Sequence, residues 1–441
     1  MSFVLADESI VGLRLFTADE VLSPYVYVFY AAYLVALIFT PVMRLIAREY
    51  GIIDQPDGVR KVHTQPVAYL GGVAVFLGWL AGLALSQFLV LHRVEDGLPK
   101  YVTINFGIVL AGCGILLLGL WDDVFGLSPY RKLLGQALAG VCLVAFGIGK
   151  GAAWIFIYPV LLRTNLFFGW PPGDFERLAP YLQHHWSVDL LSGLFVIGIV
   201  LVCCNAANLM DGLDGLCGGV TAVVAAGFLF LAVSLATKSG ALNANQDALR
   251  VVLGLALLGG VLGFVPHNFN PASVFMGDAG SMFLGFACAT MIAMFAEAGH
   301  FRWVLAALVM FSLPLLDTAL AFTRRWVNRR PIFSADRYHF HHQLVARGFT
   351  VKQTVLISYA LTFIFCVLGA AVVFIRTRYA LAVYLVVFGS ILVAAYKMGM
   401  VHERVPVVPR KTLGVSGAGE VNQADPGTVL EVRDRHRPAE T

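Results

Sequence analysis

Two apolar runs joined by a short polar break decide the fold class, and residues 190–237 contain all three: LLSGLFVIGIVLVCCNAANLMDGLDGLCGGVTAVVAAGFLFLAVSLAT. The runs 190–209 and 216–237 each have the length of about 20 residues that an α-helix needs to cross roughly 30 Å of hydrocarbon. Each run is apolar on all sides, as expected for a helix that lies in lipid. The stretch therefore predicts two membrane-spanning helices joined by a polar turn.

The composition of the whole chain agrees with this prediction. Of the 441 residues, 59% are hydrophobic and only 13% are charged, whereas average soluble domains have about 25% charged residues. We therefore predict an all-α, polytopic membrane protein with about 11 transmembrane helices. The candidate spans are 25–43, 69–91, 101–121, 133–149, 190–209, 216–237, 251–266, 279–296, 303–323, 353–375 and 379–396.

The distribution of Lys and Arg predicts the orientation in the membrane. The loops after the odd-numbered spans, together with the C-terminal tail, contain 20 of the 31 basic residues, so we expect this side to be cytosolic. The loop 324–352 decides the assignment, because it concentrates seven basic residues in a short segment: Arg324, Arg325, Arg329, Arg330, Arg337, Arg347 and Lys352.

The chain is expected to have three parts. Residues 1–24 predict a short N-terminal extension, which is too acidic for a cleavable signal peptide. Residues 25–397 predict the transmembrane domain, and 398–441 a cytosolic tail whose composition is typical of disorder. Residues 150–189 are expected to form a long loop on the outer face, with aromatic side chains at the membrane interface. The seven cysteines have no metal-binding spacing and are interpreted as small core residues.

Polar residues concentrate in the loops of the cytosolic side and at the helix ends next to them. The first cluster is Asp122-Asp123, followed by Lys132. Two adjacent carboxylates at a membrane boundary repel each other and need a cation or a proton to offset the repulsion. The cluster is either a solvated loop with a basic anchor or, as we favour, a metal or acid–base pair beside a phosphate-binding Lys.

The second and third clusters each interrupt a pair of apolar runs. Residues 205–216, NAANLMDGLDGL, place two amides and two carboxylates in a Gly-rich break, which is more than an ordinary tight turn needs. Residues 268–281, NFNPASVFMGDAGS, lead into the eighth span with Asp278 at its start. Asp278 could simply cap that helix, but a helix N-terminus with small residues also favours a phosphate. Clustered oxygen ligands suit Mg²⁺.

The fourth cluster is DRYHFHH, residues 336–342, in the most basic loop. Three histidines and an arginine predict an anion site. Zinc is the alternative, which we disfavour because no cysteine lies nearby. Two weaker features are Arg60-Lys61-Val62-His63, which could only anchor the topology, and Asp317 inside the ninth span. Asp317 has either a functional role or a structural ion pair with Arg324.

With these motifs the chain resembles the polyprenyl-phosphate N-acetylhexosamine-1-phosphate transferase family. The resemblance covers roughly residues 50–350 and consists, in order, of RKVH…LGG, DD-x₈-K, NxxNxxDGLDGL, FMGDAGS and DRYHFHH. It implies ten or eleven helices and a cytosolic active-site cleft. It also implies that Asn208 and Asp278 ligate Mg²⁺, with Mn²⁺ able to substitute, and that Asp122 and Asp123 are catalytic.

The resemblance further assigns two groups of binding residues. The phosphates are expected at Lys132, Arg337, His339, His341 and His342. The nucleotide is expected at Asp211, Gly212, Leu213, Asp214 and Phe275.

The implied reaction joins a UDP-HexNAc to undecaprenyl phosphate or a similar polyprenyl phosphate, giving polyprenyl diphosphate-HexNAc and UMP in the bacterial inner membrane. Asp122 is the expected base for a single displacement, and a covalent aspartyl intermediate is the alternative. The expected partners are the polyprenyl phosphate, the UDP-sugar and the bilayer, with a homodimer possible and no nucleic acid.

Departures from the peptidoglycan branch favour UDP-N-acetylglucosamine as donor. Gly126 stands where that branch has Lys, and His-Phe-His-His stands where it has three consecutive histidines. Both favour the branch that starts O-antigen, enterobacterial common antigen or teichoic-acid linkage units. Ser273 stands where a basic residue is common just before the FMGD motif. The alternatives are a phospho-MurNAc-pentapeptide transferase and, from other classes, a transporter of lipid-linked sugars or a membrane scaffold.

Overall fold

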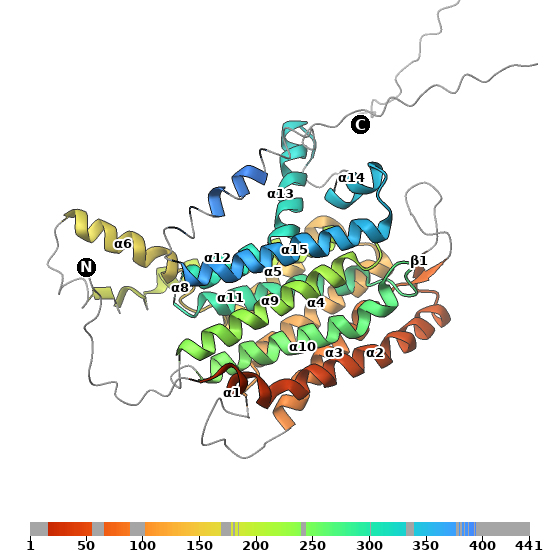
Figure 1. The fold of residues 1–441 in the computed structure, drawn as a ribbon, viewed down its shortest axis with the longest axis horizontal. Helices are drawn as coiled ribbons and strands as arrows, with labels where there is room; N and C mark the ends of the chain where they lie inside the picture. The colour runs from red at the N-terminus through yellow and green to blue at the C-terminus, as the bar shows by residue number, and fades with distance from the viewer. Residues whose placement is uncertain are drawn as a thin grey trace, which may run out of the picture. The chain divides into compact units, whose positions relative to one another are not determined.

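The computed structural model describes residues 16–54, 66–88, 102–168, 178–179, 181–183, 185–239, 244–299, 301–331, 339–375 and short pieces between 379 and 393. In these residues the chain is helical apart from turns and one two-stranded sheet (Figure 1). The elements are α1 (Ala18–Leu22), η1 (Ser23–Tyr25), α2 (Val26–Glu49), β1 (Ile53–Asp54), β2 (Val67–Ala68), α3 (Gly71–Phe88), α4 (Phe106–Phe125), α5 (Pro129–Ala145), α6 (Trp154–Phe168), α8 (Trp186–Met210), α9 (Leu216–Ser239), α10 (Ala244–Asn268), α11 (Gly277–Ala296), α12 (Phe301–Met310), α13 (Ser312–Val327), α14 (Phe340–Ala346) and α15 (Val351–Phe374).

The helices confirm an all-α, multi-pass membrane protein. Within the described residues, seven helices are long and apolar enough to cross a bilayer, and an eighth span results if α12 and α13 count as one. The expected spans at 69–91 and 133–149 correspond to α3 and α5, which are shorter. Most of the expected last span, 379–396, lies outside the described residues, as does the predicted tail. The count of eleven spans therefore stays a prediction.

Two segments differ from the expectation. Residues 150–189 are not a continuous loop, because α6 occupies Trp154–Phe168 and α8 already begins at Trp186. Trp154 and Tyr158, one helical turn apart, have ring centroids 5.6 Å from each other. The expected span at 303–323 is broken at Phe311, where α12 and α13 meet at a bend of 74°. Figure 1 shows α13 standing across the direction of the neighbouring helices.

The central helix is α11. All its residues are buried except Asp278, and it packs against α3, α4, α8, α9 and α12. Small residues permit these close helix contacts. A side chain at Gly72 of α3 would collide with the backbone of Gly280, and one at Gly285 would collide with the backbone of Cys203 on α8. Asp278 is therefore the one residue of α11 whose side chain is not fully covered by the surrounding helices.

Helix ends gather at one end of this bundle, which we call the site end. There α2, α4, α8 and α10 finish, and α3, α5, α9 and α11 begin. The β1–β2 hairpin lies beside it, because Phe275 N–H, just before α11, donates to Ala68 O at 2.7 Å. Gly71 N–H in turn donates to Phe275 O at 2.9 Å. The polar clusters of the sequence occupy these ends, as the alternating direction of the predicted spans requires.

Candidate active site

Asp278 receives contacts from two other helices at the site end. Its Oδ1 accepts a hydrogen bond from Asn208 Nδ2 of α8 at 2.9 Å, and its Oδ2 lies 2.7 Å from Lys132 Nζ of α5. Asn208 also donates to Ser281 Oγ at 3.0 Å. Three residues that lie up to 146 positions apart in the chain therefore meet at the start of α11.

Asp123 caps α11 from a different helix. Its Oδ1 accepts from the Asp278 N–H at 2.8 Å and its Oδ2 from the Ala279 N–H at 3.1 Å. These N–H groups have no partner within the helix, and a carboxylate beside them is favoured by the helix dipole. Asp278 does not cap its own helix, so its carboxylate is available to Asn208 and Lys132. Asp123, expected to be catalytic, has a structural task here.

Asp122 lies on the other side of Lys132. Its Oδ1 accepts from the Leu127 N–H at 2.6 Å, and its Oδ2 forms an ion pair with Lys132 Nζ. The chain can return to α5 so quickly because Gly126 ends α4 with a φ of 68°, a conformation that glycine adopts without steric cost. The Lys132 ammonium thus lies between the carboxylates of Asp122 and Asp278.

The break after α8 and the loop before α11 form one structure. Asp214 Oδ2 accepts from Asn270 Nδ2 at 2.9 Å and from the Ala272 N–H at 3.0 Å. The Gly215 N–H donates to Asn268 Oδ1 at 3.0 Å. The second and third polar clusters of the sequence are therefore held together by amide and carboxylate side chains.

Asp211 shows that this site has an excess of negative charge. Burial, together with repulsion from Asp278, Asp123 and Asp214, raises the pKa of its carboxyl to about 8. Of these four carboxyl groups, only that of Asp278 forms an ion pair within the described residues, with the Lys132 ammonium. Such a cluster favours the binding of additional positive charge.

The histidine motif is anchored by the carboxylate inside the ninth predicted span. Asp317 Oδ2 lies 2.9 Å from His339 Nδ1, and Asp317 Oδ1 accepts from the Phe340 N–H at 2.8 Å. Asp317 therefore holds the start of α14 and orients the imidazole of His339. Arg337, Arg60 and Lys61 lie outside the described residues.

His341 does not provide the positive charge expected of it. It is 1% exposed, and burial lowers the pKa of its imidazole to about 3, with His342 adding repulsion. Both of its ring nitrogens lack a hydrogen-bond partner in the described part of the chain. The ring packs against Gly212, where a side chain would collide with Nε2. At neutral pH His341 is therefore an uncharged donor and acceptor facing the break after α8.

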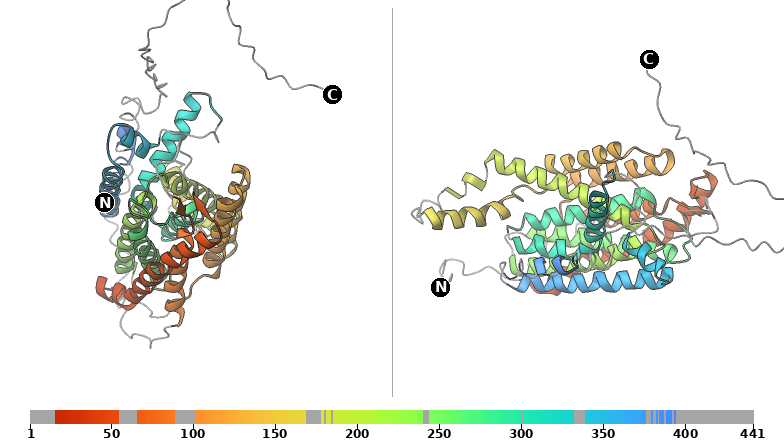
Figure 2. Two further views of the ribbon diagram at one scale, coloured as in Figure 1. Left: turned by 90° about the vertical axis from the view of Figure 1, so that its right-hand side faces the viewer. Right: turned by 90° about the horizontal axis from the view of Figure 1, so that it is seen from above.

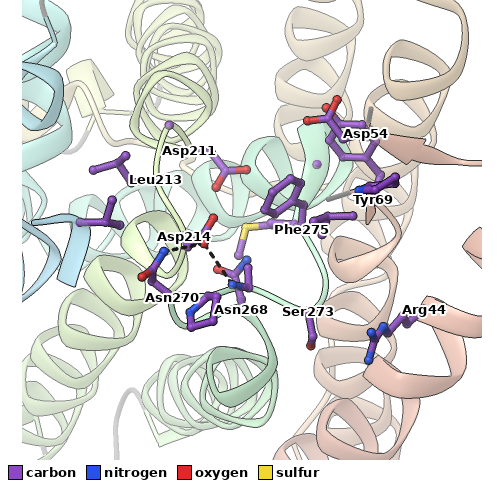
Figure 3. A pocket seen from close by; sticks show the side chains of 18 of the residues that line it. Arg44, Asp54, Tyr69, Asp211, Leu213, Asp214, Asn268, Asn270, Ser273 and Phe275 are labelled. Atoms are coloured by element: carbon purple, nitrogen blue, oxygen red, sulfur yellow. Dashed lines mark hydrogen bonds between the residues drawn. The ribbon is translucent and has the colours of Figure 1, made fainter. Parts of the chain in front are cut away.

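A cavity of about 730 Å³ lies beside these groups. Its walls include all five residues predicted to bind the nucleotide, together with His342 and Gly277. Figure 3 shows Asp211, Asp214, Asn268 and Asn270 on one side, with Phe275 between them and the opposite wall. Because Gly277 immediately precedes Asp278, the cavity borders the cluster of Asp122, Lys132, Asn208 and Asp278.

The opposite wall in Figure 3 contains Arg44, Asp54 and Tyr69, and Arg48 also lines the cavity. Sequence reasoning assigned none of these four residues to the site. Arg44 Nε is buried and has no hydrogen-bond partner in the described residues. The two arginines follow an apolar run on the side that the sequence predicts to be cytosolic, where the positive-inside rule accounts for any basic residue. Only their spacing of four residues, which puts them on one helix face, could have indicated a shared surface.

The donor set fits a hard divalent cation. Asn208, Asp278 and Asp211 offer amide and carboxylate oxygens, which are the ligands of Mg²⁺, and the carboxylates are short of positive charge. In the described residues, no three His, Cys, Asp or Glu side chains form a cluster of their own with metal-binding geometry. A cation here would therefore rely on Asn208 and on ligands supplied by substrate.

One segment of the chain matches a known protein family. Residues 105–296, from the start of α4 to the end of α11, match the family described as glycosyl transferase family 4. The matched segment contains every residue of the cluster around Asp278.

Three relatives illustrate the likeness. A probable undecaprenyl-phosphate N-acetylglucosaminyl 1-phosphate transferase of Bacillus subtilis is 30% identical over 79% of this chain and 85% of that protein. A decaprenyl-phosphate N-acetylglucosaminephosphotransferase of Mycobacterium tuberculosis is 33% identical over 80% of this chain and 82% of that protein. A phospho-N-acetylmuramoyl-pentapeptide-transferase of Desulforudis audaxviator is 30% identical over 77% and 95%.

Proposed function

Because the chain belongs to the polyprenyl-phosphate N-acetylhexosamine-1-phosphate transferases of glycosyl transferase family 4, we propose that it transfers N-acetylglucosamine-1-phosphate from UDP-N-acetylglucosamine to a polyprenyl phosphate. The observation that carries the proposal is the meeting of Asn208, Lys132 and Asp278 at the edge of a polar cavity. Relatives named for N-acetylglucosamine transfer support this donor over UDP-MurNAc-pentapeptide.

The cavity suits the nucleotide sugar. Ligand pockets commonly have volumes of about 300–1,000 Å³, and this one has about 730 Å³. Phe275 offers an aromatic face to the uracil. The amides of Asn268 and Asn270 lie in the same wall of the cavity as Asp211 and Asp214. The diphosphate then extends past Gly277 toward Lys132 and Asp278.

The reaction is a displacement at phosphorus. An oxygen of the polyprenyl phosphate forms a bond to the β-phosphorus of the donor, and the bond from that phosphorus to the bridging oxygen breaks, so UMP leaves with its electron pair. Both reactants are anions, and the enzyme must offset their repulsion. Lys132 provides a fixed ammonium at the place where this charge develops.

Mg²⁺ is the cofactor that we propose for Asn208 and Asp278, and when bound it would supply positive charge to the diphosphate. In the protein alone, Lys132 and Asn208 occupy the Asp278 carboxylate. Substrate and cation would compete with these contacts. The dependence on the cation is therefore expected to be strongest when donor is present.

Asp122 is our candidate for the base that accepts any proton from the polyprenyl phosphate. Its carboxylate is fixed by Leu127 and Lys132 next to Asp278. The demand on a base is small, since a phosphate monoester with a second pKa near about 6 is largely dianionic at neutral pH. A covalent aspartyl-phosphate on Asp122 is the alternative route, and a trapped intermediate would distinguish it.

We further propose that the site end faces the cytosol of a bacterium and that the bilayer is its inner membrane. The basic residues at this end, including Arg44, Arg48, Arg131 and Lys132, follow the positive-inside rule. The cytosol is also where UDP-sugars are made available to an enzyme of this kind.

The test is UMP release by the purified protein in detergent. UDP-N-acetylglucosamine should give UMP only when polyprenyl phosphate and Mg²⁺ are both present, and EDTA should abolish release. A donor panel including UDP-N-acetylgalactosamine and UDP-MurNAc-pentapeptide checks the sugar. Release of UMP that does not depend on the lipid phosphate would disprove the transferase assignment.

A further inference from the structure

The two proposed substrates make opposite demands on their binding surfaces. The cavity beside Asp211 has arginine, aspartate and asparagine side chains in its walls beside apolar ones, a mixture that suits a nucleotide better than a long hydrocarbon. A polyprenyl phosphate needs an apolar surface that ends at the reacting groups.

A groove of about 660 Å³ lies between α4 and α5. Its walls are apolar side chains of both helices, including Leu110, Leu117, Leu118 and Leu138, and the only charged residue among them is Arg131. In Figure 2 these two helices, coloured orange, lie side by side at the edge of the bundle. Leu117 and Leu138 are about 60% exposed, at 64% and 59%, so the groove opens away from the protein core.

Small residues create the space in the groove. A side chain at Gly114 of α4 would meet nothing within 4 Å, and Gly135 of α5 lets the side chain of Leu118 lie against its backbone. Ala111 and Ala139 also line the groove. Larger residues at these positions would close the space between the two helices.

The groove ends at the catalytic cluster. Leu127, which lines it, donates its N–H to Asp122 Oδ1 at 2.6 Å. Arg131 lines it too, and the next residue is Lys132, which contacts Asp122 and Asp278. The guanidinium of Arg131 has no hydrogen-bond or ion-pair partner among the described residues, so a cation stands at the end of an apolar channel.

We propose that this groove holds the part of the isoprenoid chain nearest the phosphate of the acceptor, and that Arg131 binds that phosphate. The inference rests on the proposed function and adds the place of the acceptor. Donor and acceptor then approach Lys132 from two sides, the donor through the polar cavity by way of Gly277 and the acceptor along α4 and α5. An amphipathic anion matches both features of the groove.

The test compares Gly114→Leu with Gly198→Leu. Gly198 of α8 also has no neighbour within 4 Å of an added Cβ, but it lies outside the groove. The readout is transfer of sugar phosphate with a long polyprenyl phosphate as acceptor. We expect Gly114→Leu to raise KM for this acceptor by about tenfold, the effect of losing apolar contacts in a binding pocket. KM for UDP-N-acetylglucosamine should stay unchanged, and Gly198→Leu should match the wild type in both.

Arg131→Gln is the second variant, because it keeps a polar side chain and the groove. It should raise KM for long and for short-chain isoprenyl phosphates alike, whereas Gly114→Leu should affect the long acceptor more. Acceptor KM values equal to those of Gly198→Leu in both variants would overturn the inference, as would an equal rise in KM for donor and acceptor. A wild-type protein that transfers sugar phosphate to no polyprenyl phosphate would instead refute the proposed function itself.

Discussion

At the scale of residues, the carboxylate of Asp278 is the point on which the site depends. Its two oxygens contact Asn208 and Lys132, and the backbone N–H of the same residue donates to Asp123. We expect Asp278→Asn to lower kcat by about 100-fold or more, because a group that organises transition-state charge is lost while its volume remains. UMP release measures the effect, with Asp189→Asn, at the other end of α8, as the control. Full activity in Asp278→Asn would remove this residue from the site.

Arg44 supplies a second residue-scale prediction. Its Nε is buried at the wall of the cavity without a partner in the described chain, and a buried donor of this kind calls for an anionic or carbonyl ligand. We expect Arg44→Gln to raise KM for UDP-N-acetylglucosamine by about tenfold, with KM for the polyprenyl phosphate unchanged. Steady-state kinetics with each substrate varied in turn measure both constants. Arg347→Gln, an exposed arginine after α14, is the control.

The neutral imidazole of His341 predicts how stability depends on pH. Its folded-state pKa is about 3, whereas an unfolded chain has a histidine pKa of about 6.5. Between these values the unfolded chain binds a proton that the folded protein does not, so the free energy of unfolding falls as the pH falls below about 6.5. Among the neighbouring groups, His342 and His339 lower the pKa of this ring by repulsion and Asp317 raises it.

His341→Gln should remove this contribution. The slope of the free energy of unfolding against pH should decrease by up to about 1.4 kcal/mol per pH unit between about pH 4 and about pH 6. Thermal unfolding in detergent over this range measures it. A variant with the slope of the wild type would mean that His341 is not buried in its neutral form.

Most of the site could be predicted from residue types alone, because placing a polar side chain next to lipid costs free energy and such residues are rare there. Asn208, Asp211 and Asp278 stand out in an apolar sequence, and the structure brings them together. Arg44 and Arg48 could not be recognised in the same way, since basic residues are expected at any helix end on the predicted cytosolic side, with or without a site. Asp123 of α4 caps the N-terminus of α11. This contact depends on how the two helices approach each other, so no local sequence pattern predicts it.

At the scale of elements, α3 and α11 cross where both begin. A side chain at Gly72 would collide with the backbone of Gly280, and Gly72 N–H donates to Met276 O at 2.9 Å. We expect Gly72→Ala to lower the free energy of unfolding by about 1–3 kcal/mol, the usual effect of overpacking a tight contact. Gly198→Ala, which meets no neighbour, should be neutral or slightly stabilising. Thermal unfolding of both variants compares them, and equal midpoints would contradict the close approach.

The positions of the long helices were predictable, whereas breaks and short helices were not. Apolar runs of sufficient length located α2, α4, α8, α9, α10, α11 and α15. The run 303–323 stays apolar through the 74° bend at Phe311, so hydropathy does not locate the break. Its one local sign is Pro314, which lies in the first turn of α13. Helix α6 lies within the segment 150–189 that was expected to be a loop, and it contains Pro159, a residue that usually interrupts helices.

At the scale of the whole molecule, the alternating direction of the spans decides where the chemistry lies. All loops that follow odd-numbered spans lie on the same side of the membrane. The motifs between residues 122 and 342 lie in such loops, so their position at one end of the bundle could be predicted. The described residues confirm this for the clusters at Asp122, Asp211, Asp278 and His342. The parity argument says nothing about the cavity walls, because the volume between helices depends on side-chain packing.

The central claim is that the donor loses its β-phosphate together with the sugar. The most direct measurement uses UDP-N-acetylglucosamine radiolabelled at the β-phosphorus, with purified protein, polyprenyl phosphate and Mg²⁺, followed by extraction into organic solvent. We predict that the label moves into the lipid fraction in equal amount to the UMP released, and that Asp278→Asn prevents both. Sugar in the lipid fraction without the labelled phosphate, or label that stays in water while UMP is released, would contradict it.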